Sequence, residues 1–225
     1  AMYTTGTNPN YQYSTKMGED LVNDFEEVMA GKDAIRSQFG AFIAYTDGEN
    51  IVHCIWKYEM GDTDPTNPDA IRLKDDANWI IYRMADVMLM KAEALIWKGK
   101  ENWQEAVDII NQIRTRANLL EKTIAIDEED ESSMMENYLL PERNIELAAE
   151  GKRWYDMIRY AKSKNYAHKS AFIALVQQYN TTANASWIRS VLQNEYAWYL
   201  PIHADEIENN TLLVQNPYYG ITGNN

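Results

Sequence analysis

Three glutamates in the middle of the chain have the residue type and spacing that could support acid–base chemistry. Glu142, Glu146 and Glu150 recur every four residues, which places their carboxylates on one face of a helix. Glycosidases use two carboxyl groups about 5–9 Å apart across a sugar bond, so two of the three could act as acid and base. A solvent-exposed or arginine-paired face is the alternative, because Arg143, Arg153 and Arg159 are near in sequence. The spacing alone leaves both interpretations open.

Other patterns that carry catalysis or metal binding are absent from the sequence. His53, His168 and His203 lack metal-ligand spacing, and no glycine-rich phosphate loop or Gly-x-Ser-x-Gly motif occurs. Residues 62–64 begin like a calcium loop, but the later ligands are missing. Cys54 is the single cysteine, which excludes an internal disulfide. We therefore expect no metal site and no cofactor.

Charge and composition argue against two classes of protein. The 225 residues carry 21 Lys and Arg against 34 Asp and Glu, a net charge of −13, and the bases are interspersed with acids. Nucleic-acid binding is therefore not expected, because neutralising phosphates needs a basic patch. No apolar run approaches the roughly 20 residues that cross a bilayer, and residues 1–5 do not resemble a secretory signal. The chain is either cytoplasmic or a fragment whose export signal lies upstream.

A pair of amphipathic helices is the strongest structural signal. From Trp79 to Gly99 and again from Trp103, apolar residues step by three and four, and Asn102 with Glu105 resembles a capping box. The two predicted stripes are Ile81, Met84, Met88, Ala92 and Leu95, and then Trp103, Ala106, Ile110, Ile113 and Ala117. The short connection predicts an antiparallel hairpin like a tetratricopeptide repeat (TPR), with Ala94 and Ala106 as the small contact residues and Trp97 as the neighbouring aromatic.

Shorter elements are expected on both sides of this hairpin. The fold class is all-α, with TPR-like helical hairpins, long loops and at most a small β-hairpin. The expected elements are a loop over residues 1–20, a helix over 20–30, a weak β-hairpin within 39–58, a loop over 62–70, an exposed acidic linker over 127–131, a helix from Pro141 to Gly151, a helix that buries Trp154, Ile158 and Ala161, two helices within 166–195, and an irregular tail over 199–219.

Aromatic residues with a polar edge are unusually frequent. The sequence has 7 Trp and 15 Tyr but only 4 Phe. Trp97, Trp103 and Trp154 lie on apolar stripes, so we expect them in the core. A sugar packs its C–H face on a flat ring while neighbouring polar groups bind its hydroxyls, so rings outside such stripes are candidate ligand contacts. These candidates are Tyr3, Tyr11, Tyr13, Trp187 and Trp198. The alternative is that these rings only cover the surface, or pack on an N-terminal part of the protein that is missing from this chain.

Four blocks of sequence resemble the SusD/RagB family of outer-membrane nutrient-binding lipoproteins. The blocks are the two helices Ile81–Leu95 and Ala106–Ala117, the segment Glu142–Arg159, and the closing segment Tyr199–Tyr219, with Lys57-Tyr58 as a further match upstream. The residues that carry the resemblance, and to which it assigns structural roles, are Arg83, Asp86, Glu93, Glu142, Arg143, Glu146, Glu150, Gly151, Arg153, Trp154, Asp156, Arg159, Pro201, Asn216 and Pro217.

The resemblance implies a function and a place for the chain. It implies one C-terminal domain over residues 1–225, with a helical core over 79–162, a variable helical insert over 163–198 and the closing segment over 199–219. Such a protein binds glycan at the outer-membrane surface and delivers it to a SusC-like TonB-dependent transporter. It is not an enzyme, and its lipid anchor would lie in a missing N-terminal half. A ligand-free interaction scaffold and an α-helical glycoside hydrolase remain as alternatives.

Overall fold

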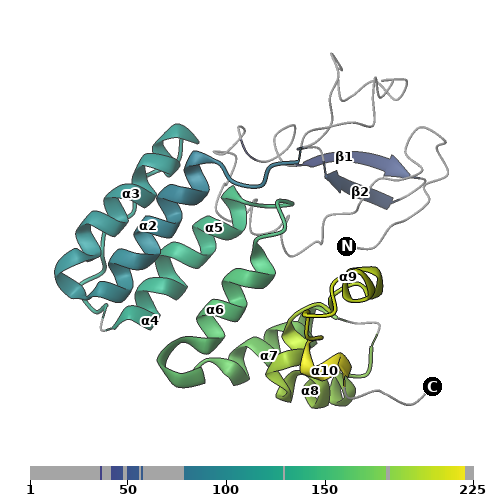
Figure 1. The fold of residues 1–225 in the computed structure, drawn as a ribbon. Coiled ribbons are helices and arrows are strands. Elements are labelled where there is room, and N and C mark those ends of the chain that lie inside the picture. Colours follow the sequence, from purple (N-terminus) through teal and green to yellow (C-terminus); the bar gives the residue numbers. More distant parts are fainter. Residues whose placement is uncertain are drawn as a thin grey trace. The chain divides into compact units, whose positions relative to one another are not determined.

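The computed structural model describes residues 36, 42–47, 50–55, 57, 79–128, 130–180 and 183–220. The chain packs as two compact units, residues 1–153 and residues 154–225, each with its own helices (Figure 1). The elements predicted for residues 1–20, 20–30 and 62–70 lie outside the described residues. That residues 1–225 form one domain stays a prediction.

The β-hairpin predicted within residues 39–58 is confirmed. β1 (Phe42–Asp47) pairs antiparallel with β2 (Asn50–Ile55), and the register runs from Phe42 opposite Ile55 to Asp47 opposite Asn50. Isoleucine, valine and aromatic residues favour extended backbone here. The other regular elements among the described residues are helices, as the all-α prediction requires.

The first unit is built on an antiparallel helical hairpin, as predicted (Figure 1). α2 (Met84–Lys98) and α3 (Trp103–Arg116) are joined through Gly99 and a 3₁₀ turn, Lys100–Asn102. The Trp103 indole nitrogen donates to the Ile96 carbonyl at 3.2 Å and fixes the two helices at their junction. The whole predicted α3 stripe is buried.

The predicted apolar stripe of α2 is correct only in part. Ala92 and Leu95 are buried as predicted, but Ile81 and Met84 are exposed and Met88 is half-buried. The helix also buries Ala85, Leu89 and Ile96, which form one face with Ala92 at steps of four, three and four. Ala94 is exposed and Trp97 is half-buried, so the small contact residue of α2 is Ala92, which is fully buried together with Ala106 of α3. The paired helices are therefore confirmed, but the predicted repeat register shifts by two residues.

The predicted capping box at the start of α3 is also absent. The Asn102 side chain makes no cap hydrogen bond to the helix; its amide nitrogen instead lies 3.4 Å from the Gly99 carbonyl. The 3₁₀ turn already supplies a hydrogen bond to the Gly99 carbonyl, because the Asn102 backbone N–H donates to it at 2.9 Å.

A third helical run begins ten residues before the predicted start at Pro141. α4 (Glu131–Met134), a π-helical turn (Met135–Leu139) and α5 (Leu140–Glu146) follow one another without a break. Proline cannot donate to the carbonyl four residues earlier, and its ring crowds that oxygen. The wide π turn comes directly before the proline, and the freed Asn137 carbonyl accepts a hydrogen bond from Lys122 Nζ at 2.6 Å.

The acidic segment before α4 is not a wholly exposed linker. Asp127 is exposed as predicted, but Glu128 is buried and accepts a hydrogen bond from the Asn137 amide at 3.0 Å. Asp130 caps α4 by accepting from the Ser133 N–H at 2.9 Å. The segment is therefore partly built into the helical unit.

The second unit contains short helices around one core. Its regular elements are α6 (Arg153–Tyr166), α7 (Lys169–Tyr179), α8 (Ala185–Gln193), a 3₁₀ turn (Glu195–Trp198), α9 (Ala204–Asn209) and α10 (Pro217–Gly220). The two helices predicted within residues 166–195 are α7 and α8. The tail over 199–219 is not wholly irregular as predicted, because α9 and α10 lie in it. Helical backbone angles in α6 stop after Lys162, because Ser163, Lys164 and Asn165 are non-helical.

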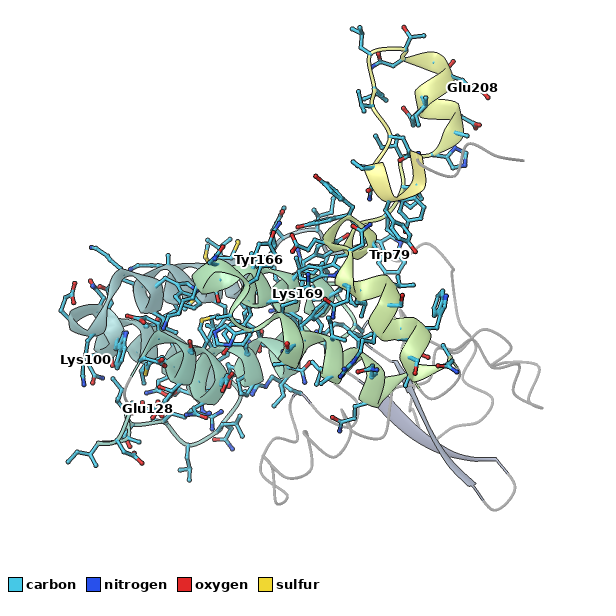
Figure 2. All side chains as sticks on the ribbon, turned by 90° about the horizontal axis from the view of Figure 1, so that it is seen from below. Trp79, Lys100, Glu128, Tyr166, Lys169 and Glu208 are labelled. Atoms are coloured by element: carbon cyan, nitrogen blue, oxygen red, sulfur yellow. The ribbon has the colours of Figure 1, made fainter. Side chains whose placement is uncertain are left out.

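The core of this unit gathers side chains from α6, α7, α8 and the 3₁₀ turn. Ile158 and Ala161 are buried as predicted, with Phe172, Ile188 and Trp198 among their neighbours. The prediction that Trp154 is a core residue is wrong, since 38% of it is exposed. Figure 2 shows the described side chains of both units. No helix in the described ranges is both long and apolar enough to span a membrane.

Candidate functional site

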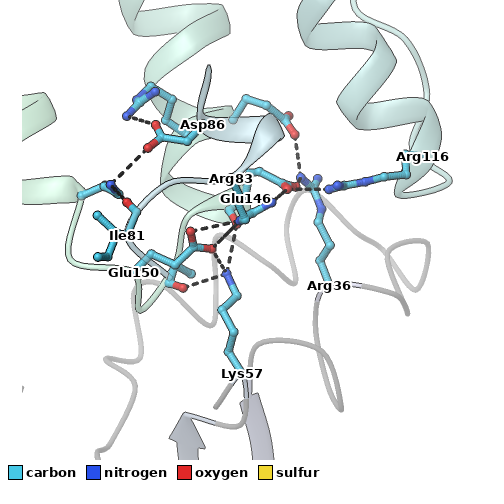
Figure 3. Close-up of polar contacts among 12 residues, drawn as sticks. Arg36, Lys57, Ile81, Arg83, Asp86, Arg116, Glu146 and Glu150 are labelled. Carbon is cyan, nitrogen blue, oxygen red and sulfur yellow. Dashed lines mark hydrogen bonds and ion pairs between the residues drawn. The ribbon is translucent and has the colours of Figure 1, made fainter. Parts of the chain in front are cut away.

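The carboxylates of α5 are buried in a network of basic side chains (Figure 3). Arg36 Nη1 lies 2.6 Å from Glu142 Oε1 and 2.9 Å from Glu146 Oε2, so one guanidinium bridges both carboxylates. Arg114 of α3 pairs with the other oxygen of Glu142 at 2.9 Å. Glu146 also pairs with Arg83 at 2.6 Å and with Arg116. Only 2% of the Glu146 side chain is exposed.

Glu150 extends this network beyond the end of α5. Its carboxylate pairs with Lys57 at 2.7 Å and with Arg83 at 2.8 Å. Lys57 Nζ also donates to the backbone carbonyls of Glu146 and Ala148, at 3.1 and 2.9 Å. Carbonyls at a helix C-terminus lack helical partners and carry the negative end of the dipole, so cations stabilise them. Lys57 and Arg83 therefore serve both the carboxylates and the end of the helix.

Another buried carboxylate, that of Asp86, orients the start of α2. Asp86 pairs with Arg143 of α5 at 3.0 Å and with Lys152 at 3.2 Å. Lys152 Nζ also donates to the Ile81 carbonyl and lies 4.1 Å from the centre of the Tyr82 ring. Gly151, directly before Lys152, has a φ of +72°, a conformation that glycine adopts without strain. This turn brings Lys152 back to the entrance of α2.

Two pKa shifts describe the electrostatics of the network. Burial by itself would raise the pKa of Glu146, but hydrogen bonds from Arg116 and Arg83 outweigh burial and lower it. Burial lowers the pKa of Lys57, and the contacts with Glu150 offset only part of that effect. Glu146 is therefore held as a carboxylate.

This arrangement does not suit the glycosidase interpretation of the three glutamates. A general acid needs a raised pKa so that it carries a proton near neutral pH. Glu146 has the opposite shift, and the oxygens of Glu142 and Glu150 are occupied by basic side chains. The network can fix helix α5 against α2, α3, Arg36 and Lys57, and that is a structural task.

The predicted ligand-contact aromatics divide into two kinds. Trp187 on the first turn of α8 is 62% exposed, and Asn184 holds that turn by accepting from the Ser186 and Trp187 N–H groups. Trp198 is 1% exposed, so its candidacy as a ligand contact is wrong. Its indole packs edge-on against Phe172 and donates to the Leu192 carbonyl at 2.9 Å. Tyr3, Tyr11 and Tyr13 lie outside the described residues.

Among the remaining residues that carry the family resemblance, Glu93 is half-buried on α2 and Arg159 lies within α6, whereas the others lie at turns and helix ends. Asn216 Nδ2 donates to the carbonyls of Tyr196 and Tyr199, at 2.9 and 3.1 Å. Pro217 opens α10, and Pro201 is exposed. Arg153 donates to the Leu140 carbonyl at 3.2 Å, and Arg159 pairs with the buried Asp156 at 2.8 Å. Apart from the pair of Arg159 and Asp156, these contacts close turns and helix ends.

The sequence did not identify two features of the structure, the role of Arg36 and a set of exposed tyrosine rings. Arg36 was not singled out, and its partners lie over a hundred residues away, so no local pattern marks it. The exposed rings of Tyr155, Tyr196 and Tyr199 were also missed, although they belong to the same class as Trp187. Among the residues that the structure describes, no group of three or more His, Cys, Asp or Glu side chains could hold a metal ion.

Two SusD-like proteins of one bacterium are similar in sequence to parts of this chain. The chain is 40% identical over 96 residues to SusD-like protein P38 of Formosa agariphila, covering 40% of this chain and 18% of that protein. It is 32% identical over 152 residues to SusD-like protein P2 of the same organism, covering 65% of this chain and 27% of that protein. The chain thus spans less than a third of either relative.

A solved structure shows the same fold. The crystal structure of a SusD superfamily protein from Bacteroides thetaiotaomicron VPI-5482 superposes with a TM-score of 0.57 at 21% identity, covering 97% of this chain and 41% of that chain. The sequence model of the SusD family matches residues 2–219. The chain therefore belongs to the SusD family.

Proposed function

We propose that the protein binds glycan at the bacterial cell surface and delivers it to a SusC-like TonB-dependent transporter, without cleaving it. Membership of the SusD family over residues 2–219 is the observation that carries this proposal. The protein would reach the outer membrane through an N-terminal lipid anchor, as the resemblance implies. That the chain is the C-terminal half of such a protein stays a prediction.

Trp187 supports the binding role. Its ring is exposed, while the backbone beneath it is fixed by the Asn184 cap. An aromatic side chain on an ordered backbone loses less conformational entropy when a pyranose stacks on it than one on a mobile loop, and polar neighbours can bind the hydroxyls. Of the five predicted ligand-contact aromatics, Trp187 is the one that the structure both describes and exposes. It is therefore the candidate contact.

The occupied carboxylates of α5 support the absence of catalysis. An acid–base pair needs oxygens that can reach a substrate, and Glu142 and Glu146 are bound by Arg36, Arg83, Arg114 and Arg116. The Glu146 pKa is lowered, so this residue cannot supply a proton at neutral pH.

Calorimetric titration of a panel of oligosaccharides into the purified protein tests the proposal. We expect at least one glycan to bind, and Trp187→Ala to weaken that binding about tenfold while the sugar stays intact. Trp79→Ala, an exposed tryptophan of the other unit, is the matched control and should bind as the wild type does. Absence of heat with every glycan would favour the ligand-free scaffold, and release of reducing sugar that Glu146→Gln abolishes would establish a hydrolase.

A further inference from the structure

A second group of rings lies at the surface of residues 154–220. Trp154 opens α6 and is 38% exposed, Tyr155 is 48% exposed, and Tyr199 is 38% exposed. The Trp154 indole nitrogen donates to the carbonyl of Trp198 at 2.8 Å, across 44 positions of sequence, and Tyr199 is the next residue. The start of α6 and the segment after the 3₁₀ turn are therefore adjacent. We call Trp154, Tyr155, Tyr199 and Lys162 the α6 ring platform.

The rings of Trp154 and Tyr199 are held in place before any ligand arrives. Trp154 packs edge-on against Phe172, with ring centres 5.3 Å apart, in addition to its hydrogen bond to the Trp198 carbonyl. The Tyr199 hydroxyl accepts from Lys162 Nζ at 3.1 Å, and its carbonyl accepts from Asn216 at 3.1 Å. A ring that is already held in place loses less conformational entropy on binding than a surface ring that is free to move.

The exposed face of α6 is basic in an acidic protein. Tyr155, Arg159 and Lys162 follow one another at steps of four and three, so they share one side of the helix. Arg159 and Lys162 are both exposed there. The single acid of α6, Asp156, is buried and pairs with Arg159. Glu195, which also lies near Lys162, is bound by Lys169 at 3.2 Å.

We propose that the α6 ring platform binds an oligosaccharide that carries carboxylate or sulfate groups. Pyranose faces would stack on Trp154, Tyr155 and Tyr199, while Lys162, with Arg159 beside it, pairs with the anionic substituent. Local charge complementarity supports an anionic ligand, because Lys162 and Arg159 are exposed beside the rings, in a chain whose net charge of −13 repels anions elsewhere. The inference rests on the proposed glycan-binding function and adds the ligand's charge and a contact surface separate from Trp187.

Four oligosaccharides separate the sources of negative charge. Oligogalacturonate carries carboxylates, and its methyl ester is the uncharged counterpart; a carrageenan oligosaccharide carries sulfates, and its desulfated form is the uncharged counterpart. Each is titrated calorimetrically into the purified protein. We expect one or both charged sugars to bind about tenfold or more tightly than the uncharged counterpart, and this preference to fall as salt is raised, because charge pairing is screened. The charged sugar that binds identifies the source.

Substitutions place the ligand on the platform. Lys162→Met keeps the aliphatic stem and removes the charge, so it should weaken binding of the charged sugar about tenfold and reduce the salt dependence. Tyr199→Leu should weaken both charged and uncharged sugars. Lys100→Met is the matched control, because Lys100 also lies over an aromatic ring, 5.5 Å from the centre of Trp103, in the other unit. Thermal unfolding of each variant confirms that it is folded.

The other possible results would contradict this inference, and one of them would also contradict the proposed function. Equal binding of charged and uncharged sugars, or wild-type affinity in both Lys162→Met and Tyr199→Leu, would overturn the inference and leave the proposed glycan-binding function standing. Binding of only neutral glycans from the larger panel would do the same. Absence of binding by every glycan would overturn both.

Discussion

Replacing Glu146 with glutamine tests whether the buried network stabilises the first unit. The substitution keeps the shape of the side chain and removes the charge that Arg36, Arg83 and Arg116 share. Removing one member of a buried ion pair costs about 3–5 kcal/mol, because the opposite charge is left buried without compensation.

The contacts of Glu146 place the expected loss at the lower end of that range. Arg36 keeps Glu142, Arg83 keeps Glu150, and the side chain of Arg116 is 57% exposed and can turn to water. We therefore expect the free energy of unfolding to fall by about 3 kcal/mol. For a chain of this length, that loss lowers the melting temperature by about 6–12 °C.

Urea unfolding followed by circular dichroism measures this change. Glu105→Gln is the matched control, because Glu105 pairs with Lys91 at 2.7 Å at the surface, where such a pair contributes about 0–1 kcal/mol. If Glu146→Gln unfolds within about 1 kcal/mol of the wild type, as Glu105→Gln should, the network does not contribute to stability as reasoned here.

Three further predictions concern pH and single positions. The pKa of Glu146 is lower in the folded chain than its ordinary value of 4.5, so its contribution to the free energy of unfolding is present above about pH 4.5 and is lost as pH falls through the folded pKa. Acid should therefore destabilise the wild type more than Glu146→Gln, and urea unfolding curves taken at several pH values measure this. Gly151→Ala should cost about 1 kcal/mol in urea unfolding, because φ is +72° although the added methyl group has open space; Gly220→Ala, without a positive φ, should cost less, and equal losses would contradict this reasoning. Phe172→Ala removes a buried ring that packs on Trp198, so unfolding should become about 3–5 kcal/mol easier and the near-ultraviolet tryptophan signal should weaken; an unchanged signal would argue against this packing.

Helical periodicity predicted α3 correctly because polar and apolar residues separate cleanly on that helix. Trp103, Ala106 and Ile110 all lie on the predicted face and are buried. The β-hairpin was also predictable, since its strands alternate around the turn signal at residues 47–48. In these elements local pattern and tertiary packing agree.

The phase of α2 could not be obtained in the same way. This helix carries apolar residues around most of its circumference, and Met84 and Val87 remain exposed, so periodicity does not select one face. The buried face also includes Asp86, a residue that a hydrophobic pattern assigns to solvent. Its burial depends on Arg143 and Lys152, which are distant in sequence.

In the candidate site, too, local pattern predicts some features and long-range packing decides the others. Spacing put Glu142, Glu146 and Glu150 together and left pairing with arginine as one alternative, but the partner Arg36 has no local signal. Trp198 was misplaced because it lies in a 3₁₀ turn, where helical periodicity gives no information on burial. The sequence therefore predicts which residues share a helix face, while long-range packing decides which of them reach water.

The π-helical turn before Pro141 has a consequence for insertions and deletions in this part of the chain. A wide turn holds more backbone per revolution than an α-helical turn, so Met135–Leu139 sets the rotation of α5 relative to α4. Deleting one residue there would let the wide turn close to an α-helical turn and leave α5 at nearly the same rotation, whereas deleting one residue from an α-helical part of the run would rotate everything after it by about 100° around the helix axis. In the second case Glu146 would face away from Arg83. The rotation of α5 is therefore less sensitive to the loss of one residue at this turn than elsewhere along the run.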